Sequence, residues 1–407
     1  MLRCSSLFSQ VLSLVDRQEF HRLVVNHEAE KHAKGYSCWA HFVAMLFCQL
    51  AQAKSIREIC GGLACCVGKL RHLGIGDSPS KSTLSYANAH RPWEMYRDLF
   101  YRLLERYQGS MKGKKRKFRF KNKLLSLDTT TISLCLSIFP WAKFRRTKGA
   151  VKLHLLLDHD GYLPSYAYIS NGKKHDVTIA KQVPLTPGSI VAMDRGYNDY
   201  RLFSFWTQSG IYFVTRMKEN AVYEVIQDRD APPRKQNYIL SDELIRFTGA
   251  GAQEKCPHVL RRVVVWDEEN QRQIVLLTNQ FSFAADTISA IYKDRWEIEI
   301  FFKTLKQNLK VKTFVGTSEN ALYIQIWTAL IAMLIIKYLQ HLSKMAWSLS
   351  NLVTLLRWNL FTYRDLQAWL DDPFQTPPAE PEPVQELLPF SGLGQHLCMI
   401  DKTRTRL

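Results

Sequence analysis

The chain has 407 residues, of which 46% are hydrophobic and 12% aromatic, so it is neither a peptide-sized module nor a chain dominated by disorder. A chain of this length is expected to fold as more than one packed unit. Lysine and arginine outnumber aspartate and glutamate by 55 to 37, and the resulting net charge of +18 favours a polyanionic partner.

Targeting and redox features indicate a cytoplasmic protein. The nine cysteines are odd in number and include no CxxC pair, which argues against a disulfide framework and against a zinc site. The apolar residues at the amino terminus alternate with serine and glutamine, unlike those of a signal peptide. The apolar stretch 321–339 contains Gln325 and Thr328, so we interpret it as a buried core helix, with no membrane partner expected.

Residues 1–111 carry apolar side chains at helical spacing and are predicted to form an all-helical domain. One helix should begin near Ser78 or Ser80, which can cap it, and end before Pro92. Its small, polar or basic side chains are of the kinds that a recognition helix places in the major groove of DNA, namely Lys81, Ser82, Ser85, Asn88 and Arg91. A solvated helix surface is the alternative that the sequence leaves open.

Residues 112–123, here called the basic segment, contain eight basic and no acidic residues and link the helical domain to the rest of the chain. Such a run is often a solvated linker, but its charge also suits contacts with phosphates. The candidate contacts are Lys114, Lys115, Arg116 and Lys117. Phe118 and Phe120 alternate with basic residues, a pattern that allows part of the segment to pair as an edge strand.

From residue 124 the apolar period changes from 3.6 to 2, and the sequence predicts an α/β fold. Strands are expected at 124–132, 149–158 and 163–170, followed by a helix near 175–182 and a further strand at 189–194. Three antiparallel strands, a crossover helix and a further strand form the opening of an RNase-H-like core.

The remaining chain divides by composition. The RNase-H-like core is expected to span 124–218 in its first part and 291–372, mostly helical, in its second. Between them, residues 219–290 are strand-rich and slightly acidic, and we interpret them as a β-rich insertion. Residues 373–407 form a proline-rich break and a tail.

Three carboxylates occupy positions that suit binding of a metal ion. Asp128 lies in the middle of the strand 124–132, on one face with Ser126 and Thr130. Asp194 ends the strand 189–194, where the following turn would present it at the sheet edge. Aspartates in central strands without a neighbouring lysine or arginine are costly unless a cation compensates them, which favours a metal ion.

The third carboxylate is Glu299, on a predicted helix. Tyr292, Glu299 and Lys306 are seven residues apart and share one helical stripe, which Arg295 joins. A carboxylate flanked by cations and a phenol suits a metal beside a phosphodiester, since the cations can hold neighbouring phosphates. Taken alone, the helix is better explained as a surface helix with ordinary ion pairs from Glu299 to Arg295 and Lys303.

The spacing Y-x2-R-x3-E-x6-K is matched in full by Tyr292, Arg295, Glu299 and Lys306. Together with the aspartates in LDTTTI and AMDRGY, it resembles the insertion-sequence DDE transposases of family four. The resemblance extends over most of the chain and includes a helical DNA-binding region, an RNase-H-like core and a β-rich insertion before the glutamate. Separations of 66 residues from Asp128 to Asp194 and 105 from Asp194 to Glu299 suit that layout.

The resemblance implies roles for these residues. Asp128, Asp194 and Glu299 would hold two Mg²⁺ ions, with Mn²⁺ able to substitute. The ions would serve hydrolysis at the element ends and transfer of the 3′ hydroxyls to target DNA. The residues that would contact DNA are Tyr292, Arg295, Lys306, Arg216 and Lys218. Double-stranded DNA, both the inverted repeats and the target, is the implied partner, with a homodimer in the complex of two ends and a nucleoid location when bound.

Two alternatives stay open on the sequence. The same fold could serve a metal-dependent nuclease without strand transfer, or a domesticated or non-catalytic DNA-binding protein. Some relatives form a DNA hairpin and use a tryptophan just before an LLT segment, where this chain has Ile274. Whether a hairpin is formed therefore stays open.

Overall fold

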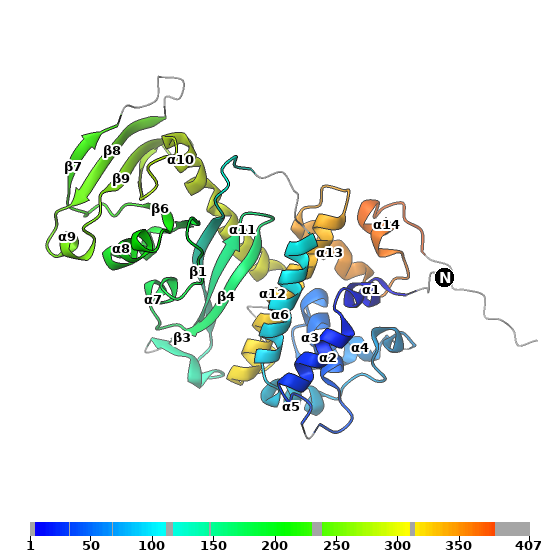
Figure 1. Ribbon diagram of the computed structural model, residues 1–407. Coiled ribbons are helices and arrows are strands. Elements are labelled where there is room, and N and C mark those ends of the chain that lie inside the picture. Colours follow the sequence, from blue (N-terminus) through cyan, green and yellow to red (C-terminus); the bar gives the residue numbers. More distant parts are fainter. Residues whose placement is uncertain are drawn as a thin grey trace, which may run out of the picture.

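A computed structural model describes residues 5–31, 33–66, 68–110, 117–145, 148–229, 238–309 and 314–378. The amino-terminal region is helical, as predicted (Figure 1). Its elements are α1 (Leu7–Ser13), α2 (Arg17–Asn26), α3 (Cys38–Ala51), α4 (Ile56–Ala64), the 3₁₀ turn η1 (Leu70–Leu73), α5 (Lys81–His90) and α6 (Glu94–Ser110).

Side-chain caps fix where most of these helices begin. A serine or aspartate just before the first turn accepts a hydrogen bond from a backbone N–H of that turn in five helices, through Ser6, Asp16, Ser37, Ser55 and Ser80. The prediction that Ser80 caps the helix ending before Pro92 is therefore confirmed. Ser78, the other candidate, donates to the carbonyl of Cys60 instead.

The strands of the described residues form one large sheet. Its order is β2 (Lys143–Arg145), β3 (Lys148–Asp158), β1 (Leu124–Leu134), β5 (Ile190–Met193), β6 (Tyr212–Arg216), β10 (Arg272–Thr278), β9 (Leu260–Asp267), β8 (Ile239–Phe247) and β7 (Tyr223–Asp228), and β4 (Leu163–Asn171) pairs with β3. β1, β3 and β4 are antiparallel, whereas β5 and β6 run parallel to β1. The order β4-β3-β1-β5-β6 fits an RNase-H-like core.

The segment 219–290 is rich in strands, as expected, but these strands do not form a sheet of their own. β10 pairs antiparallel with β6, and β9, β8 and β7 continue outward from it. The inserted strands therefore extend the core sheet, and Figure 1 shows β7 and β8 at the end of the molecule farthest from the amino-terminal helices.

Helices cover both faces of the sheet. The 3₁₀ turn η2 (Pro140–Ala142) precedes β2, and α7 (Asp176–Ala180) follows β4. After β5 come η3 (Arg195–Tyr197) and α8 (Tyr200–Gln208), and α9 (Ala252–Lys255) follows β8. One core contains α8 with β5 and β6, and another contains α10 (Ala285–Asp294) on the opposite side of the same strands. α11 (Trp296–Asn308) packs against β1.

The long apolar helix is α12 (Glu319–Leu342), and it packs against α3, α5, α6, α13 (Leu349–Asn359), α14 (Leu366–Asp371) and β4. By length and composition it could cross a membrane, but 83% of its most apolar window is buried inside the protein. The interpretation as a core helix is confirmed, and a single core joins α1–α6 to α11–α14 and one face of β3.

Two local expectations from the sequence were wrong. Phe118 and Phe120 do not pair as an edge strand; their rings stack on each other, and Phe120 stacks on Phe283 with 4.8 Å between centroids. The helix carrying Tyr292, Glu299 and Lys306 is not one continuous element. α10 ends at Asp294, and α11 begins at Trp296.

Candidate active site

Asp128 projects from the middle of β1 towards α11. Its neighbour Ser126 on the same face is buried, while the Asp128 side chain is 20% exposed. One carboxylate oxygen, Oδ1, accepts a hydrogen bond of 2.7 Å from the backbone N–H of Thr129. The strand thus holds Asp128 in a fixed place with part of its carboxylate reachable from solvent.

Asp194 lies beside Asp128 because β1 and β5 are parallel and adjacent. The last pair in their register is Leu127 with Met193, so the next residue in each chain segment is the aspartate. Adjacent strands are separated by about 4.8 Å, which places the two carboxylates on neighbouring backbones at one level of the sheet. The prediction that Asp194 sits at the carboxyl end of its strand is confirmed, and Asp194 also begins η3.

Arg295 connects Glu299 to Asp128. Its Nη2 donates to Glu299 Oε1 over 2.6 Å, and its Nη1 lies 3.9 Å from Asp128 Oδ2. The guanidinium is largely buried, and its Nε is a buried donor without a hydrogen-bond partner among the described residues. Arg295 therefore links Asp128 on β1 to Glu299 on α11, and Asp194 lies beside Asp128 at the end of β5.

The pKa of Asp128 reflects both its burial and the charges of its neighbours. The pKa of Asp128 is raised to about 6, mainly by burial; the negative charges of Asp194 and Glu299 also raise it, whereas the Thr129 N–H and the Arg295 cation lower it. A carboxyl group held above its usual pKa by burial and two neighbouring carboxylates is one that a cation would return to its charged form. The chemistry of this set, hard oxygen donors only, fits a divalent ion such as Mg²⁺.

The carboxylates are not drawn together into ligand geometry. Among the residues that the structure describes, no group of three histidine, cysteine, aspartate or glutamate side chains stands close enough to enclose an ion. Glu299 is instead the ion-pair partner of Arg295. The residues suit a divalent ion by the chemistry of their oxygen donors, whereas Glu299 is paired with Arg295.

Two further signature residues flank this place. Tyr292, at the end of α10, lies with its ring 5.5 Å from the Arg295 guanidinium. Burial and the Asp194 charge raise its pKa, and the nearby Arg295 and Arg216 cations lower it. Lys306 is on α11, two helical turns beyond Glu299. The structure thus gathers Tyr292, Arg295 and Arg216 around the carboxylates.

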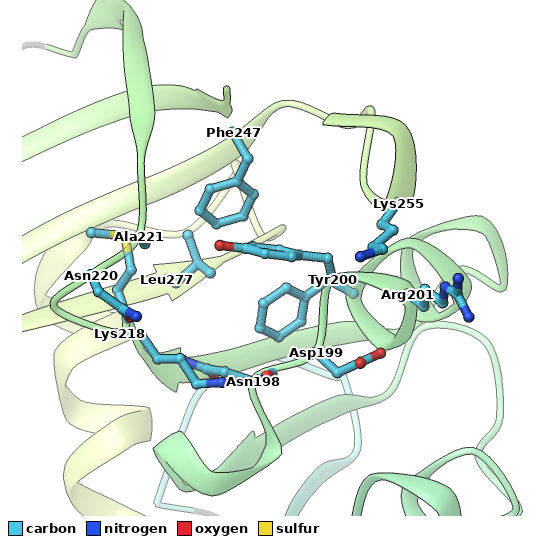
Figure 2. Close-up of a pocket in the computed structure, with 12 residues that line it drawn as sticks. Asn198, Asp199, Tyr200, Arg201, Lys218, Asn220, Ala221, Phe247, Lys255 and Leu277 are labelled. Atoms are coloured by element: carbon cyan, nitrogen blue, oxygen red, sulfur yellow. Dashed lines mark hydrogen bonds between the residues drawn. The ribbon is translucent and has the colours of Figure 1, made fainter. Parts of the chain in front are cut away.

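A cavity that the sequence did not indicate opens beside Lys218. It has a volume of about 530 Å³, and its lining includes the aromatic side chains of Tyr200, Phe203 and Phe247. Figure 2 shows the rings of Tyr200 and Phe247 close together. Lys218 lines one part of it and donates from Nζ to the carbonyl of Asn198, while Lys255 lies across the opening. Its lining comes from several separate elements, so no local sequence pattern marks it.

Helix α5 presents only part of the predicted recognition surface. Lys81, Ser82 and Ser85 lie on its outer side, and all three are exposed. Asn88 is buried and bonded through Oδ1 to His41 Nε2 at 2.8 Å, and buried Arg91 donates to the carbonyls of Ser37 and Tyr36.

The reason is the helical period. Leu84, Asn88 and Arg91 follow one another at four and three residues, so they share the face that packs against the domain core. Tyr86, absent from the residues predicted to contact DNA, is 67% exposed and stacks on His90 with 4.0 Å between ring centroids. The sequence could have indicated Tyr86 as a further surface residue, because it is an aromatic residue on the exposed face of the predicted recognition helix.

The basic segment is described only from Lys117. Lys114, Lys115 and Arg116 lie outside the described residues. Lys117 forms an ion pair with Asp294, and Lys123 lies 3.1 Å from Asp158. The described part of the segment is therefore fastened to the core by carboxylates at two points.

Two parts of the chain match known protein families. Residues 119–335 match the family described as Transposase DDE domain, and residues 3–76 match a domain of unknown function (DUF4372). A protein of Sinorhizobium fredii named as a transposase, y4zB, is 28% identical over 72% of this chain and 80% of its own length. A protein of Geobacillus stearothermophilus, named as a transposase for the insertion sequence element IS5377, is 28% identical over 65% of this chain and 68% of its own.

Among solved structures, the piggyBac transposase synaptic complex with hairpin DNA gives a weak likeness. Its TM-score is 0.40 at 10% identity, covering 88% of this chain and 79% of the other. The family match alone covers more than half of the chain, from just before β1 to within α12, and includes all three carboxylates of the site. The chain therefore belongs to the Transposase DDE domain family and is an insertion-sequence DDE transposase.

Proposed function

We propose that this transposase, of family four, binds the terminal inverted repeats of its element, cleaves phosphodiester bonds at the element ends and joins the 3′ hydroxyls to target DNA. The observation that carries the proposal is that Asp194 lies beside Asp128 on adjacent parallel strands, while Arg295 links Asp128 to Glu299. On this proposal β1, β5, β6 and α11 belong to an RNase-H-like core that the segment 219–290 interrupts.

Two Mg²⁺ ions, or Mn²⁺ in their place, would be held by Asp128, Asp194 and Glu299. When bound, such ions activate the attacking oxygen and stabilise the leaving one. Arg295 would then release Glu299 and turn its guanidinium, including the unpartnered Nε, to a phosphate of the DNA. Tyr292, Arg216, Lys218 and Lys306 would hold neighbouring phosphates of the element end.

DNA recognition is assigned to outward-facing, mostly basic surfaces. On α5 we retain Lys81, Ser82 and Ser85 as DNA contacts, whereas the inward-facing Asn88 and Arg91 serve the fold. The basic segment, with Lys114, Lys115, Arg116 and Lys117, would follow the phosphate backbone. A homodimer would bring two ends together, and the protein would act in the cytoplasm at the nucleoid.

The experiment that tests the proposal replaces Glu299 by alanine. The variant should lose Mg²⁺-dependent cleavage of a duplex carrying the element end, yet bind that duplex with unchanged affinity in a gel-shift assay. Glu297→Ala is the matched control, since Glu297 lies on the same helix, whereas the carboxylate that pairs with Arg295 is that of Glu299. Cleavage by Glu299→Ala at the wild-type rate would contradict the proposal.

A further inference from the structure

Asp294, the last residue of α10, is a buried carboxylate that the proposed chemistry does not use. Its side chain is 1% exposed and is surrounded by donors. Oδ1 accepts from Lys117 Nζ, and Oδ2 accepts from His159 Nδ1 at 2.5 Å and from the Tyr162 hydroxyl at 3.3 Å. Three donors from two different segments thus meet at one carboxylate.

This carboxylate is kept ionised by its partners. Burial alone would raise the pKa of Asp294, but the hydrogen bonds from His159 and Lys117 outweigh it, and the pKa lies below its usual value. A buried charge of this kind is costly to leave unpaired, so removing any one partner disturbs the others.

The bonds continue from Asp294 to the strand that carries Asp128. His159 Nε2 is bonded to the Ser126 hydroxyl at 2.7 Å, and Ser126 lies two residues before Asp128 on the same face of β1. At the other end, Asp294 is followed directly by Arg295, which holds Glu299. One hydrogen-bonded chain therefore joins β1, which carries Asp128, to the last residue of α10, directly before Arg295.

Ser126, His159 and Asp294 have the composition of a hydrolase triad, but the geometry excludes a nucleophilic role. Ser126 is 0% exposed, in the middle of the sheet, so no substrate carbonyl or phosphate can reach its hydroxyl. The arrangement can orient neighbouring groups but cannot attack a substrate.

Lys117 connects this chain of hydrogen bonds to solvent. Its side chain is 62% exposed and belongs to the basic segment, whose charge suits DNA. We infer that Asp294 is a positioning residue. Through its ion pair with Lys117, it makes the position of Arg295 and Glu299 in the active site depend on how the basic segment is bound to DNA. The inference rests on the proposed function, because it assumes that the segment contacts DNA and that Glu299 serves cleavage.

The test compares Asp294→Asn and Lys117→Met with Lys123→Met. Lys123 is the matched control, because it belongs to the same segment and also pairs with a buried carboxylate, Asp158, which does not adjoin Arg295 in the chain. The readouts are affinity for a precleaved end duplex, Mn²⁺ affinity of that complex by calorimetry, and cleavage rate of an intact end at saturating DNA.

We expect Asp294→Asn and Lys117→Met each to weaken Mn²⁺ binding and slow cleavage by about 10-fold, the usual effect of losing a group that orients a metal ligand. Lys123→Met also removes a charge of the basic segment and should weaken DNA binding, but it should leave Mn²⁺ affinity and the cleavage rate at saturating DNA unchanged. The double variant should be no worse than the poorer single variant, since both changes break one linkage. Lys117→Met removes an exposed side chain and keeps the test valid if Asp294→Asn does not fold.

Unchanged Mn²⁺ affinity in Lys117→Met, additive losses in the double variant, or an equal loss in Lys123→Met would each overturn the inference. Failure of the proposed function gives a different result. In that case the wild-type protein does not cleave its end, or Glu299→Ala cleaves it normally, whatever the behaviour of Lys117 and Asp294.

Discussion

At the residue scale, the charged form of Asp128 is electrostatically unfavourable in the active site. The carboxyl group is partly buried, close to two other carboxylates, and compensated by a single arginine. A site of this kind is destabilising until a cation arrives, and functional sites commonly carry such a cost.

The raised pKa of Asp128 predicts that the stability of the folded protein depends on pH. The pKa of Asp128 is raised from 3.8 to about 6, so the folded protein holds this proton more tightly than the unfolded chain. Without divalent ions, its contribution to stability therefore falls as pH rises from about 4 to about 6 and stays low above that range. Asp128→Asn should be more stable than wild type at pH 8 in a chelator, by about 3 kcal/mol, with the difference becoming small near pH 4.

Thermal unfolding at the two pH values checks this prediction. Adding Mg²⁺ at pH 8 should stabilise wild type more than the variant, because the variant lacks one ligand. A variant that is less stable than wild type at pH 8 without metal would show that Asp128 contributes to folding through contacts other than charge.

The sequence could predict which residues belong to the site, but it could not predict which of their side chains contact one another. The position of Asp128 in a strand with period 2 and the place of Asp194 at a strand end follow from local patterns. That Arg295 would hold Glu299 and approach Asp128 depends on how α11 lies on β1, which no local pattern specifies.

At the element scale, α5 separates two kinds of polar side chain. Its exposed stripe carries Lys81 and Ser85, while Asn88 and Arg91 on the inner stripe satisfy His41 and two backbone carbonyls. The helix and its cap could be predicted from the sequence but this division could not, because polar side chains on the inner face depart from the apolar pattern used to assign faces.

A matched pair of substitutions distinguishes the two stripes. Lys81→Ala should weaken DNA binding and lower the slope of its salt dependence by about 1, with an unchanged unfolding temperature. Arg91→Met should instead destabilise the fold by about 1–3 kcal/mol, because two carbonyls lose their donor. Gel shifts at several salt concentrations and thermal unfolding check both; a normal unfolding temperature with impaired binding in Arg91→Met would contradict the assignment.

At the scale of the whole molecule, the amino-terminal helices are not an independent body. They share a single core with α11–α14 and one face of β3, and α12 lies against α3, α5 and α6 (Figure 1). The stretches 1–111 and 291–372 were predicted as separate units because they are far apart in the chain. Helical periodicity shows that each has an apolar face but not that the faces meet.

The shared core predicts how a fragment behaves. Residues 1–110 expressed alone should lack cooperative thermal unfolding, because without α12 the apolar faces of α3 and α6 are exposed to water. The full chain should unfold these helices together with the carboxyl-terminal ones. A fragment with a sharp unfolding transition and native-like near-ultraviolet circular dichroism would contradict this.

For the molecule as a whole, we propose that three carboxylates from β1, the end of β5 and α11 form one site for cleavage and joining of DNA. The most direct measurement supplies a precleaved element end, a target plasmid and Mg²⁺ to the wild-type protein and to Asp194→Asn. We expect joined products with the wild-type protein and none with Asp194→Asn, while both bind the end equally. Joining by Asp194→Asn at the wild-type rate, or nicking of the target by the wild-type protein without any joined product, would contradict the proposal.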